Sequence, residues 1–454
     1  MADTFDLIVL GAGTGGYAAA IRAATLGMSV ALIERDKVGG TCLHRGCIPT
    51  KALLHAGEVL DTVRDAGRFG VTAGEPTFDW TGVQTYKDRV VTKMYRGLES
   101  LIKHRKIEII TGSGTMTSPT SVRVGERTLT GRAVVVATGS APRMLPGLTA
   151  GSRVLTSDEA LGAGVPRSAI VLGGGSVGVE FASVWSSFGA TVTIVEMLPG
   201  LVPLDDADLG KELARAYSKR GIAVHTGAKL ENAVVTDDGV RATLSIDGKT
   251  ETLDAEVLLV AVCRRPVTDG LDASITTDRG FITVGSNCRT NIDTVFAVGD
   301  VIPTPGLAHV AFAEGMLVAE HLAGLDPKPI NYDAIPRATY SSPEIGAVGL
   351  TEAQARERGY EVETKTVALA GIGKATILGE PGGFCKLVSE KGGALLGAHF
   401  IGARVTELIA EAMLAVGWEA MPEEIAQLIH PHPSLSEVFG EAALAISGRA
   451  LHTT

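Results

Sequence analysis

The segment around Cys42 and Cys47 carries the densest chemical signal in the sequence. A close cysteine pair in a long chain with five cysteines favours redox, catalytic or metal chemistry over a structural disulfide framework. On a regular helix, residues five apart have Cα atoms about 8.7 Å apart, beyond the roughly 7 Å that a disulfide tolerates. A bridge would therefore need an irregular backbone, which Gly46 permits before Pro49 restarts a helix.

A metal site is the alternative for this segment. Cys42, His44 and Cys47 could supply three ligands, but the segment lacks a fourth ligand and the tight spacing of metal motifs. We therefore expect no metal in this protein.

A glycine pattern near the start of the chain indicates dinucleotide binding. Residues 5–10 form an apolar run that predicts a strand, and Ala-rich sequence up to Leu26 predicts a helix. Three glycines stand between them: Gly11, Gly13 and Gly16. Such glycines let a pyrophosphate approach the N-terminus of a helix, and Glu34, at the end of the next strand, could bind a ribose.

The same pattern recurs later in the chain. A strand at 169–172 leads into three further glycines, Gly173, Gly175 and Gly178, and the strand after the next helix ends in Glu196. Gly173 minus Gly11 and Glu196 minus Glu34 both give 162. Two such units predict two dinucleotide sites, the alternative being two α/β domains whose glycines serve only close packing.

The acid of the second unit indicates which nicotinamide dinucleotide binds there. Glu196 favours free ribose hydroxyls, because a 2′-phosphate would require Arg or Lys at this place. We therefore expect NAD rather than NADP. At the first site Arg35 follows Glu34 directly, so the charge there discriminates less clearly between a free ribose and a 2′-phosphate.

The chain resembles the flavin-dependent pyridine nucleotide-disulfide oxidoreductases over essentially its whole length. Besides the cysteine segment, the resemblance rests on five segments in order: Thr138–Ser140, Arg264–Pro266, Thr294–Asp300, Tyr340–Glu344 and His430–Glu437. It implies a redox-active disulfide between Cys42 and Cys47, FAD at the first glycine pattern and NAD at the second. The implied activity is oxidation of protein-bound dihydrolipoamide with reduction of NAD.

The resemblance also implies which residues hold the two cofactors. For FAD these are Gly11, Gly13, Gly16, Glu34, Arg35, Thr41, Lys51, Thr138, Gly139, Asp300, Ala308 and His309. For NAD they are Gly173, Gly175, Gly178, Glu180 and Glu196. Lys51 and Glu180 resemble an ion pair beside the flavin that also serves catalysis, and the alternative is an ordinary interdomain salt bridge.

The catalytic roles follow from the same resemblance. Cys42 would exchange with the substrate while Cys47 contacts the flavin. His432, oriented by Glu437 and with His430 as a secondary member, would take a proton from the dithiol. From the residues alone, 434–437 is also a capping box, in which case Glu437 only closes the end of a helix.

Four residues depart from the usual family pattern, and one of them is Val310, which follows 307–309 where Lys is common. His44 and Arg45 replace a typical Asn-Val pair, and their positive charge could alter the potential of the disulfide. Cys263 stands where glycine is usual, and we expect it to be a small buried residue at the end of a strand.

The predicted fold class is α/β, with two Rossmann-like dinucleotide-binding domains for FAD and NAD and a C-terminal α+β dimerisation domain. The predicted segments are 1–147 for FAD, 148–269 for NAD, 270–336 for the rest of the FAD and central region, and 337–454 for the interface. The resemblance implies a homodimer with shared active sites, in which His432 of one chain reaches the cysteines of the other. It also implies lipoyl domains of a 2-oxo acid dehydrogenase complex, or a glycine cleavage carrier protein, as partners.

Composition excludes several functions. The 454 residues carry a formal net charge of −10, which makes nucleic acid and anionic membranes improbable partners. The N-terminus lacks a secretory pattern, and no apolar run approaches the roughly 18 residues that span a bilayer, so we expect a cytoplasmic protein.

Two alternative functions remain. The first is an NAD(P)H-dependent flavoprotein disulfide reductase of glutathione or mercuric ion, and the second is a non-catalytic flavoprotein subunit.

Overall fold

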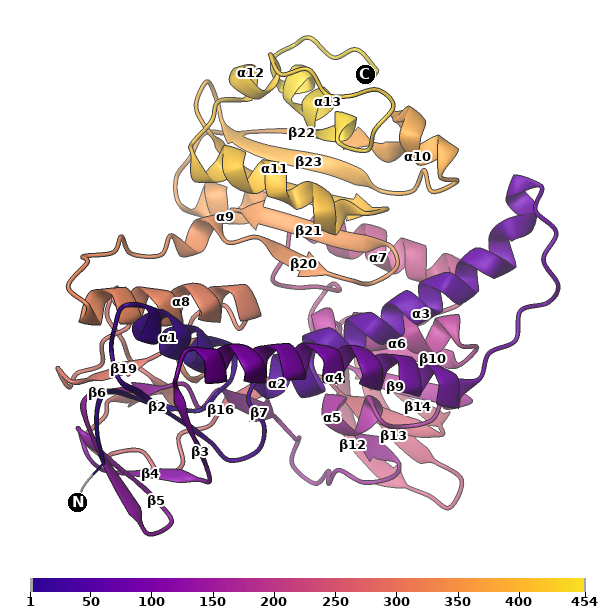
Figure 1. Ribbon diagram of the computed structural model, residues 1–454. Helices are drawn as coiled ribbons and strands as arrows, with labels where there is room; N and C mark the ends of the chain where they lie inside the picture. The colour runs from indigo at the N-terminus through magenta and orange to yellow at the C-terminus, as the bar shows by residue number, and fades with distance from the viewer. Residues whose placement is uncertain (1–2, 453–454) are drawn as a thin grey trace. The chain divides into compact units, whose positions relative to one another are not determined.

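The computed structural model describes residues 3–452, and the chain divides into two compact units (Figure 1). The first unit contains the residues up to 52 together with 84–143 and 263–332. The second contains 53–83, 144–262 and the residues from 333 onward. The four segments predicted from the sequence divide the chain differently and stay a prediction.

The first unit is built on a mostly parallel sheet. Strand β1 (Asp3–Leu10) pairs in parallel with β2 (Val30–Glu34) and β6 (Arg127–Val136), and β19 (Val295–Ala297) pairs in parallel with β6. The sheet is completed, in the order β3-β2-β1-β6-β5-β4, by β3 (Glu108–Thr111), β4 (Gly114–Ser118) and β5 (Ser121–Val124). The last four residues of β1 are buried, as expected for a strand covered on both faces.

Two helices of the first unit pack closely against each other. Figure 1 shows α1 (Thr14–Thr25) beside α8 (Ala308–Leu322). A Cβ atom at Gly315 of α8 would lie only 2.3 Å from the backbone oxygen of Gly15 in α1. Glycine at this crossing therefore allows the two backbones to touch.

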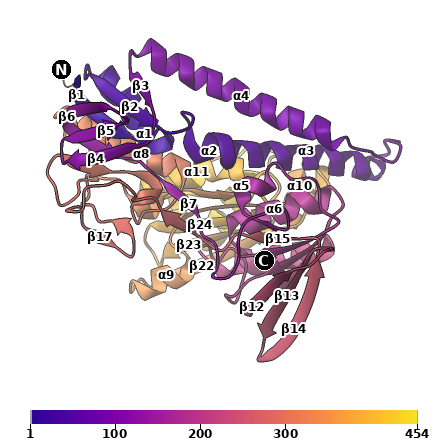
Figure 2. The ribbon, with the colours of Figure 1, turned by 90° about the horizontal axis from the view of Figure 1, so that it is seen from below.

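The chain between β2 and β3 is mostly helical, with an irregular stretch at 70–79. It forms α2 (Gly40–Arg45), α3 (Cys47–Asp65), the short 3₁₀ helix η1 (Ala66–Phe69) and α4 (Trp80–His104). Figure 2 shows α4 as one long unbroken helix.

The second unit repeats the strand, glycine turn and helix arrangement. Strand β9 (Ser168–Leu172) pairs in parallel with β10 (Thr191–Val195) and β15 (Val257–Val260), and helix α6 (Ser176–Ser187) follows β9. The sheet order is β11-β10-β9-β15-β8, with β11 at Ala223–His225 and β8 at Val154–Leu155. Helices α1 and α6 both have 12 residues and begin at 14 and 176, which confirms the predicted repeat with its offset of 162.

An antiparallel sheet and several short elements complete the nucleotide-binding regions. The sheet contains β12 (Ala228–Val235), β13 (Val240–Ile246) and β14 (Lys249–Ala255). The other helices are α5 (Ser157–Ala160), α7 (Ala207–Lys219), η2 (Gly299–Val301) and η3 (Tyr332–Ala334). The short strands are β7 (Ser140–Pro142), β16 (Arg264–Pro266), β17 (Thr277–Asp278) and β18 (Phe281–Ile282).

The C-terminal part of the second unit is an antiparallel sheet covered by helices. Its order is β20-β21-β24-β23-β22, from strands at Arg337–Thr339, Glu344–Gly349, Leu395–Gly402, Phe384–Glu390 and Val362–Ala368 respectively. The helices are α9 (Glu352–Glu357), η4 (Leu369–Gly371), α10 (Gly373–Ile377), α11 (Val405–Gly417), α12 (Pro422–Ile425) and α13 (Glu437–Ile446). The predicted fold class, two Rossmann-like regions and a C-terminal α+β domain, is thus confirmed.

None of the helices between residues 3 and 452 is long and apolar enough to cross a membrane.

Candidate functional site

The first glycine turn combines tight packing with an open position. Gly11 has φ +102°, and a Cβ there would lie 2.3 Å from the oxygen of Ala137. A Cβ at Gly16 would lie 1.8 Å from the oxygen of Gly11. At Gly13, the N-cap of α1, a Cβ would meet nothing within 4 Å, and no side chain caps the helix. Close packing thus explains Gly11 and Gly16, while Gly13 leaves the helix N-terminus accessible to an anionic group.

The second glycine turn has the same geometry. Gly173 has φ +109°, and its Cβ would lie 2.4 Å from the oxygen of Ala261. A Cβ at Gly178 would lie 1.9 Å from the oxygen of Gly173, whereas a Cβ at Gly175 would meet nothing within 4 Å. Both turns therefore fit a dinucleotide whose pyrophosphate lies against the helix N-terminus.

The two predicted ribose-binding acids also take equivalent positions. Glu34 accepts hydrogen bonds from the backbone N–H groups of Ala12 at 2.8 Å and Asp36 at 3.0 Å. Glu196 accepts them from Gly174 at 2.6 Å and Leu198 at 2.7 Å. These partners are themselves 162 positions apart, since 174 minus 12 and 198 minus 36 give that number. Arg35 follows as an exposed residue.

A polar cluster surrounds Asp300 in the first unit. The Ser140 hydroxyl donates to the Asp300 carboxylate at 2.6 Å, and Arg264 Nε donates to Ser140 Oγ at 2.6 Å. Thr138 donates to the backbone oxygen of Val267 at 2.5 Å. Ser140 thus donates directly to Asp300, while the Arg264 guanidinium lies 3.8 Å from the same carboxylate as an ion-pair partner. The other predicted FAD residues lie in three further places. Gly139 has a positive φ of +70°, and Thr41 lies in α2. Ala308 and His309 are the first residues of α8, a helix whose N-terminus has no side-chain cap.

Sequence reasoning missed Glu314, which organises the loop that carries Asp300. Its side chain is fully buried and accepts hydrogen bonds from the Gly299 N–H at 2.6 Å, the Thr304 hydroxyl at 2.7 Å and the Tyr332 hydroxyl at 3.0 Å. Burial raises the pKa of this carboxyl, and these hydrogen bonds oppose the shift. No local motif marks Glu314, because its partners come from separate segments.

The cysteine segment lies against the first glycine turn. A Cβ at Gly40, the first residue of α2, would lie 2.6 Å from the Cα of Gly13, and the N–H of Gly39 donates to the oxygen of Ala12 at 2.8 Å. The predicted backbone break is present: α2 ends at Arg45, Gly46 has φ −147° and ψ −110°, and α3 begins at Cys47.

The two cysteines are thiols in hydrogen-bond contact. The hydrogen bond to Cys47, together with burial, raises the pKa of Cys42, and the Lys51 ammonium opposes that shift. Tyr17 of α1 is a neighbour that the sequence did not reveal. Burial, with a contribution from the charges of Cys42 and Cys47, raises the pKa of Tyr17 to about 12.

His432 and Glu437 form a pair in the second unit. His432 Nδ1 lies 2.8 Å from one Glu437 oxygen, while the other oxygen accepts the Ser434 N–H at 2.8 Å. Partial burial acts to raise the pKa of Glu437, but the hydrogen bonds from Ser434 and His432 outweigh it and lower the pKa. Glu437 therefore orients the imidazole. The capping box expected over 434–437 is not formed, because α13 begins at Glu437 itself, after an N-cap at Ser436 that makes no side-chain cap hydrogen bond. His432 is 73% exposed.

Two further histidine and carboxylate pairs adjoin α13. His430 Nε2 lies 2.7 Å from Glu411 of α11, and its side chain is 11% exposed. His452 Nδ1 lies 2.9 Å from Glu441, whose other oxygen accepts the N–H of His452 at 3.1 Å. The charge of His452 is among the causes that lower the pKa of Glu437. Neither acid belongs to a motif in the sequence, since each lies at least 11 residues from its histidine.

Lys51 and Glu180 belong to different units, and the structure describes each by itself. Glu180 is buried in α6 and accepts the N–H of Tyr340 at 3.0 Å. Their pairing stays a prediction.

The departures from the family pattern have distinct environments. His44 Nε2 lies 2.9 Å from the oxygen of Val38, and Arg45 pairs with Asp36 at 3.0 Å. Cys263 is exposed, so the expectation of a buried residue was wrong. The reason is that β15 ends at Val260, which leaves Cys263 in the connection to β16. Among residues 3–452, no group of three or more His, Cys, Asp or Glu side chains could hold a metal ion.

Comparisons with known proteins agree with this arrangement. Residues 5–315 match the family described as pyridine nucleotide-disulphide oxidoreductase, and 335–443 match the dimerisation domain of the same description. The chain is similar to a dihydrolipoyl dehydrogenase of Bacillus subtilis, with 43% identity, and to one of Zymomonas mobilis, with 42% identity. Both matches cover 100% of each protein. The crystal structure of LpdA from Mycobacterium tuberculosis matches with a TM-score of 0.90 and 25% identity, over 98% of this chain and 99% of that one.

Proposed function

We propose that this chain, which belongs to the pyridine nucleotide-disulphide oxidoreductase family, acts as a dihydrolipoyl dehydrogenase that oxidises protein-bound dihydrolipoamide and reduces NAD. The observation that carries the proposal is that the segment with Cys42 and Cys47 packs, at Gly39 and Gly40, against a glycine turn that fits a dinucleotide. Relatives with this activity in their names, similar over the full length, support it.

The cofactors of the proposal are FAD and NAD. The first glycine turn, with Glu34, and the Asp300 cluster fit FAD, whereas the second turn, with Glu196, fits NAD. When bound, FAD would take an electron pair from the reduced cysteines and pass it to NAD. The residues of the chain have to position the two dinucleotides and manage the thiol chemistry.

The His432 pair fits the role of a general base. Because Nδ1 faces the Glu437 carboxylate, the Nε2 nitrogen can accept the proton of a substrate thiol. The carboxylate then stabilises the imidazolium. His430, held by Glu411, would be the secondary member of this group.

The thiol exchange has two steps. The substrate thiolate attacks Cys42 Sγ, a mixed disulfide forms, and the Cys42–Cys47 bond breaks with Cys47 leaving as a thiolate. The second substrate sulfur, deprotonated in turn, attacks the first, so that oxidised lipoamide leaves and Cys42 receives a proton. Exchange with the substrate at Cys42 therefore leaves the negative charge on Cys47.

We further propose a homodimer with shared sites, in which His432 of one chain serves the cysteines of its partner. The match to a dimerisation domain and the exposure of His432 support it. Mixing inactive Cys42→Ser and His432→Gln chains tests the arrangement. If sites are shared, a hybrid dimer contains one intact site and regains dihydrolipoamide oxidation. If each site lies within one chain, mixing restores nothing.

The deciding experiment for the activity is NAD reduction with dihydrolipoamide, repeated with NADP. A rate with NAD that depends on the dithiol supports the proposal. Reduction of glutathione disulfide or mercuric ion by NADPH, without dihydrolipoamide oxidation, would identify a reductase instead. A dithiol that fails to bleach the flavin would identify a non-catalytic flavoprotein.

The proposal also includes a cytoplasmic location and carriers of the lipoyl-domain type. Cell fractionation tests the location, and the assay with a lipoyl domain described below tests the carrier.

A further inference from the structure

Helix α4 carries a row of cations on its exposed side. Arg89, Lys93, Arg96 and Lys103 are all exposed, and their spacing of four, three and seven residues places them along one side of the helix. We call these four residues the basic stripe. It stands out on a chain whose formal net charge is −10.

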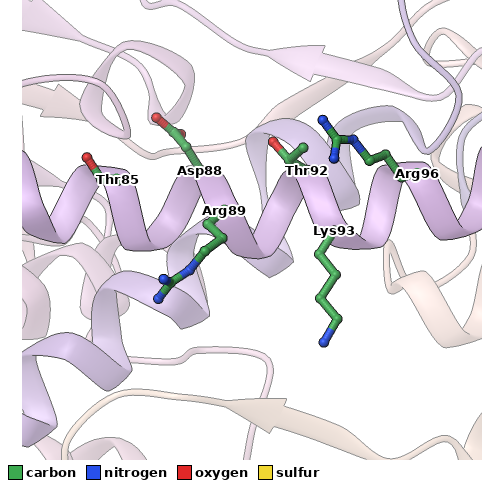
Figure 3. Close-up of a pocket in the computed structure, with 6 residues that line it drawn as sticks. All are labelled: Thr85, Asp88, Arg89, Thr92, Lys93 and Arg96. Carbon is green, nitrogen blue, oxygen red and sulfur yellow. The ribbon is translucent and has the colours of Figure 1, made fainter.

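The stripe is opposite to the packed side of α4. Ile102 is fully buried and Leu98 packs against the core of the first unit, so the helix is held through its other face. Figure 3 shows a surface hollow along α4, lined by Thr85, Asp88, Arg89, Thr92, Lys93 and Arg96. In this view the side chains of Arg89 and Lys93 extend in the same direction from the helix. Their ammonium and guanidinium groups are therefore available to an external partner.

A ring contact connects this helix to the redox segment. The imidazole of His44 and the ring of Tyr95 lie edge to face, with centroids 5.3 Å apart. His44 stands between Cys42 and Cys47, and Tyr95 directly precedes Arg96 in α4. Through Tyr95, the helix that carries the stripe therefore packs against the segment between the two cysteines, within the same unit.

We propose that the basic stripe docks an acidic surface of the lipoyl-bearing protein that delivers the dithiol, an inference that rests on the proposed function. A carrier has to bring its lipoyl arm to Cys42, and complementary charge on the helix that packs against the redox segment would raise the rate of productive encounters. We infer that the partner presents an acidic protein surface and is not a nucleic acid, because the remainder of this acidic chain would repel a long polyanion.

The test compares charge reversal on the stripe with matched reversal elsewhere. The variant Arg89→Glu/Lys93→Glu lowers the net charge by four, and so does the control Lys229→Glu/Lys249→Glu, at exposed positions of β12 and β14. The substrate is a purified, chemically reduced lipoyl domain, and free dihydrolipoamide serves as the small substrate. We expect the stripe variant to raise KM for the lipoyl domain by about tenfold at low salt, with the difference fading at high salt. The control and the reaction with free dihydrolipoamide should remain near wild type.

Each other outcome has a distinct meaning. An unchanged KM for the lipoyl domain, or an equal rise in the control, would overturn the docking proposal and leave the proposed function intact. Wild-type protein that fails to oxidise free dihydrolipoamide would refute the proposed function first, and the docking proposal with it. A short DNA duplex provides the last comparison. If the duplex binds wild type more tightly than the lipoyl domain does, and if this binding is lost in the stripe variant, the stripe is a site for polyanions and the docking proposal fails.

Discussion

The carboxylate of Glu196 accepts a hydrogen bond from the backbone N–H of Gly174 at 2.6 Å. This bond connects the residue after β10 to the glycine turn that follows the neighbouring strand β9. The second oxygen accepts the N–H of Leu198, and the residue is 8% exposed. The acid is therefore held rigidly where a ribose would lie.

This geometry predicts selectivity against a 2′-phosphate. A phosphate beside the fixed Glu196 carboxylate would cost about 2 kcal/mol or more of binding, roughly thirtyfold in kcat/KM for NADP relative to NAD. Steady-state kinetics with both cofactors measure the ratio. Glu196→Gln removes the charge and should narrow the preference. Equal specificity constants for the wild-type enzyme would contradict the NAD assignment and favour a reductase.

The two cysteines should behave differently when each is replaced. If Cys47 contacts the flavin as proposed, Cys42→Ser leaves a Cys47 thiolate there, so we expect a long-wavelength absorbance band that Cys47→Ser lacks. Both variants should lose lipoamide turnover. The absorbance spectrum of each purified holoenzyme decides the matter. A band found only in Cys47→Ser would show that the roles are reversed.

His432→Gln should remove the proposed general base. Because a positioned base contributes about 10² to 10⁴ in rate, dihydrolipoamide oxidation should fall by at least that range. Diaphorase activity, which needs only NADH, flavin and an artificial acceptor, should largely survive. Glu437→Gln should show a milder loss of the same kind.

The diaphorase assay also serves as the folding control for this variant. Near wild-type dithiol oxidation by His432→Gln would make His432 an ordinary loop residue. Loss of both activities together with FAD would instead mean that the motif only supports the start of α13.

The stability of the C-terminal domain should depend on pH through His430. Its hydrogen bond to Glu411 raises the pKa of His430, although burial acts in the opposite direction. A raised folded-state pKa stabilises the protein below the unfolded value of about 6.5, and this contribution is lost as pH rises through the raised pKa. The difference in Tm between wild type and Glu411→Gln should therefore be larger below the unfolded pKa of about 6.5 and shrink as the pH rises through the raised pKa of His430. The matched change Glu423→Gln, at an exposed acid of α12, should show no such trend.

Local features made much of this fold predictable. The strand before Gly11, the helix after it and the acid at Glu34 follow in order along the chain, and their repetition 162 residues later confirmed the pattern. Partners brought together by packing between distant segments were not predictable. Glu411 lies 19 residues from His430 in another helix, and the partners of Glu314 come from the connection before α8 and from η3 after it. Cys263 was misassigned because an apolar sequence does not show where a strand stops pairing.

His452, the last residue that the structure describes, adds a remote charge to the surroundings of the His432 and Glu437 pair. Its N–H and imidazole are both held by Glu441, and its charge contributes to the low pKa of Glu437. A His452→Ala variant would therefore remove a positive charge near Glu437 without touching the hydrogen bonds that Glu437 makes to His432 and Ser434.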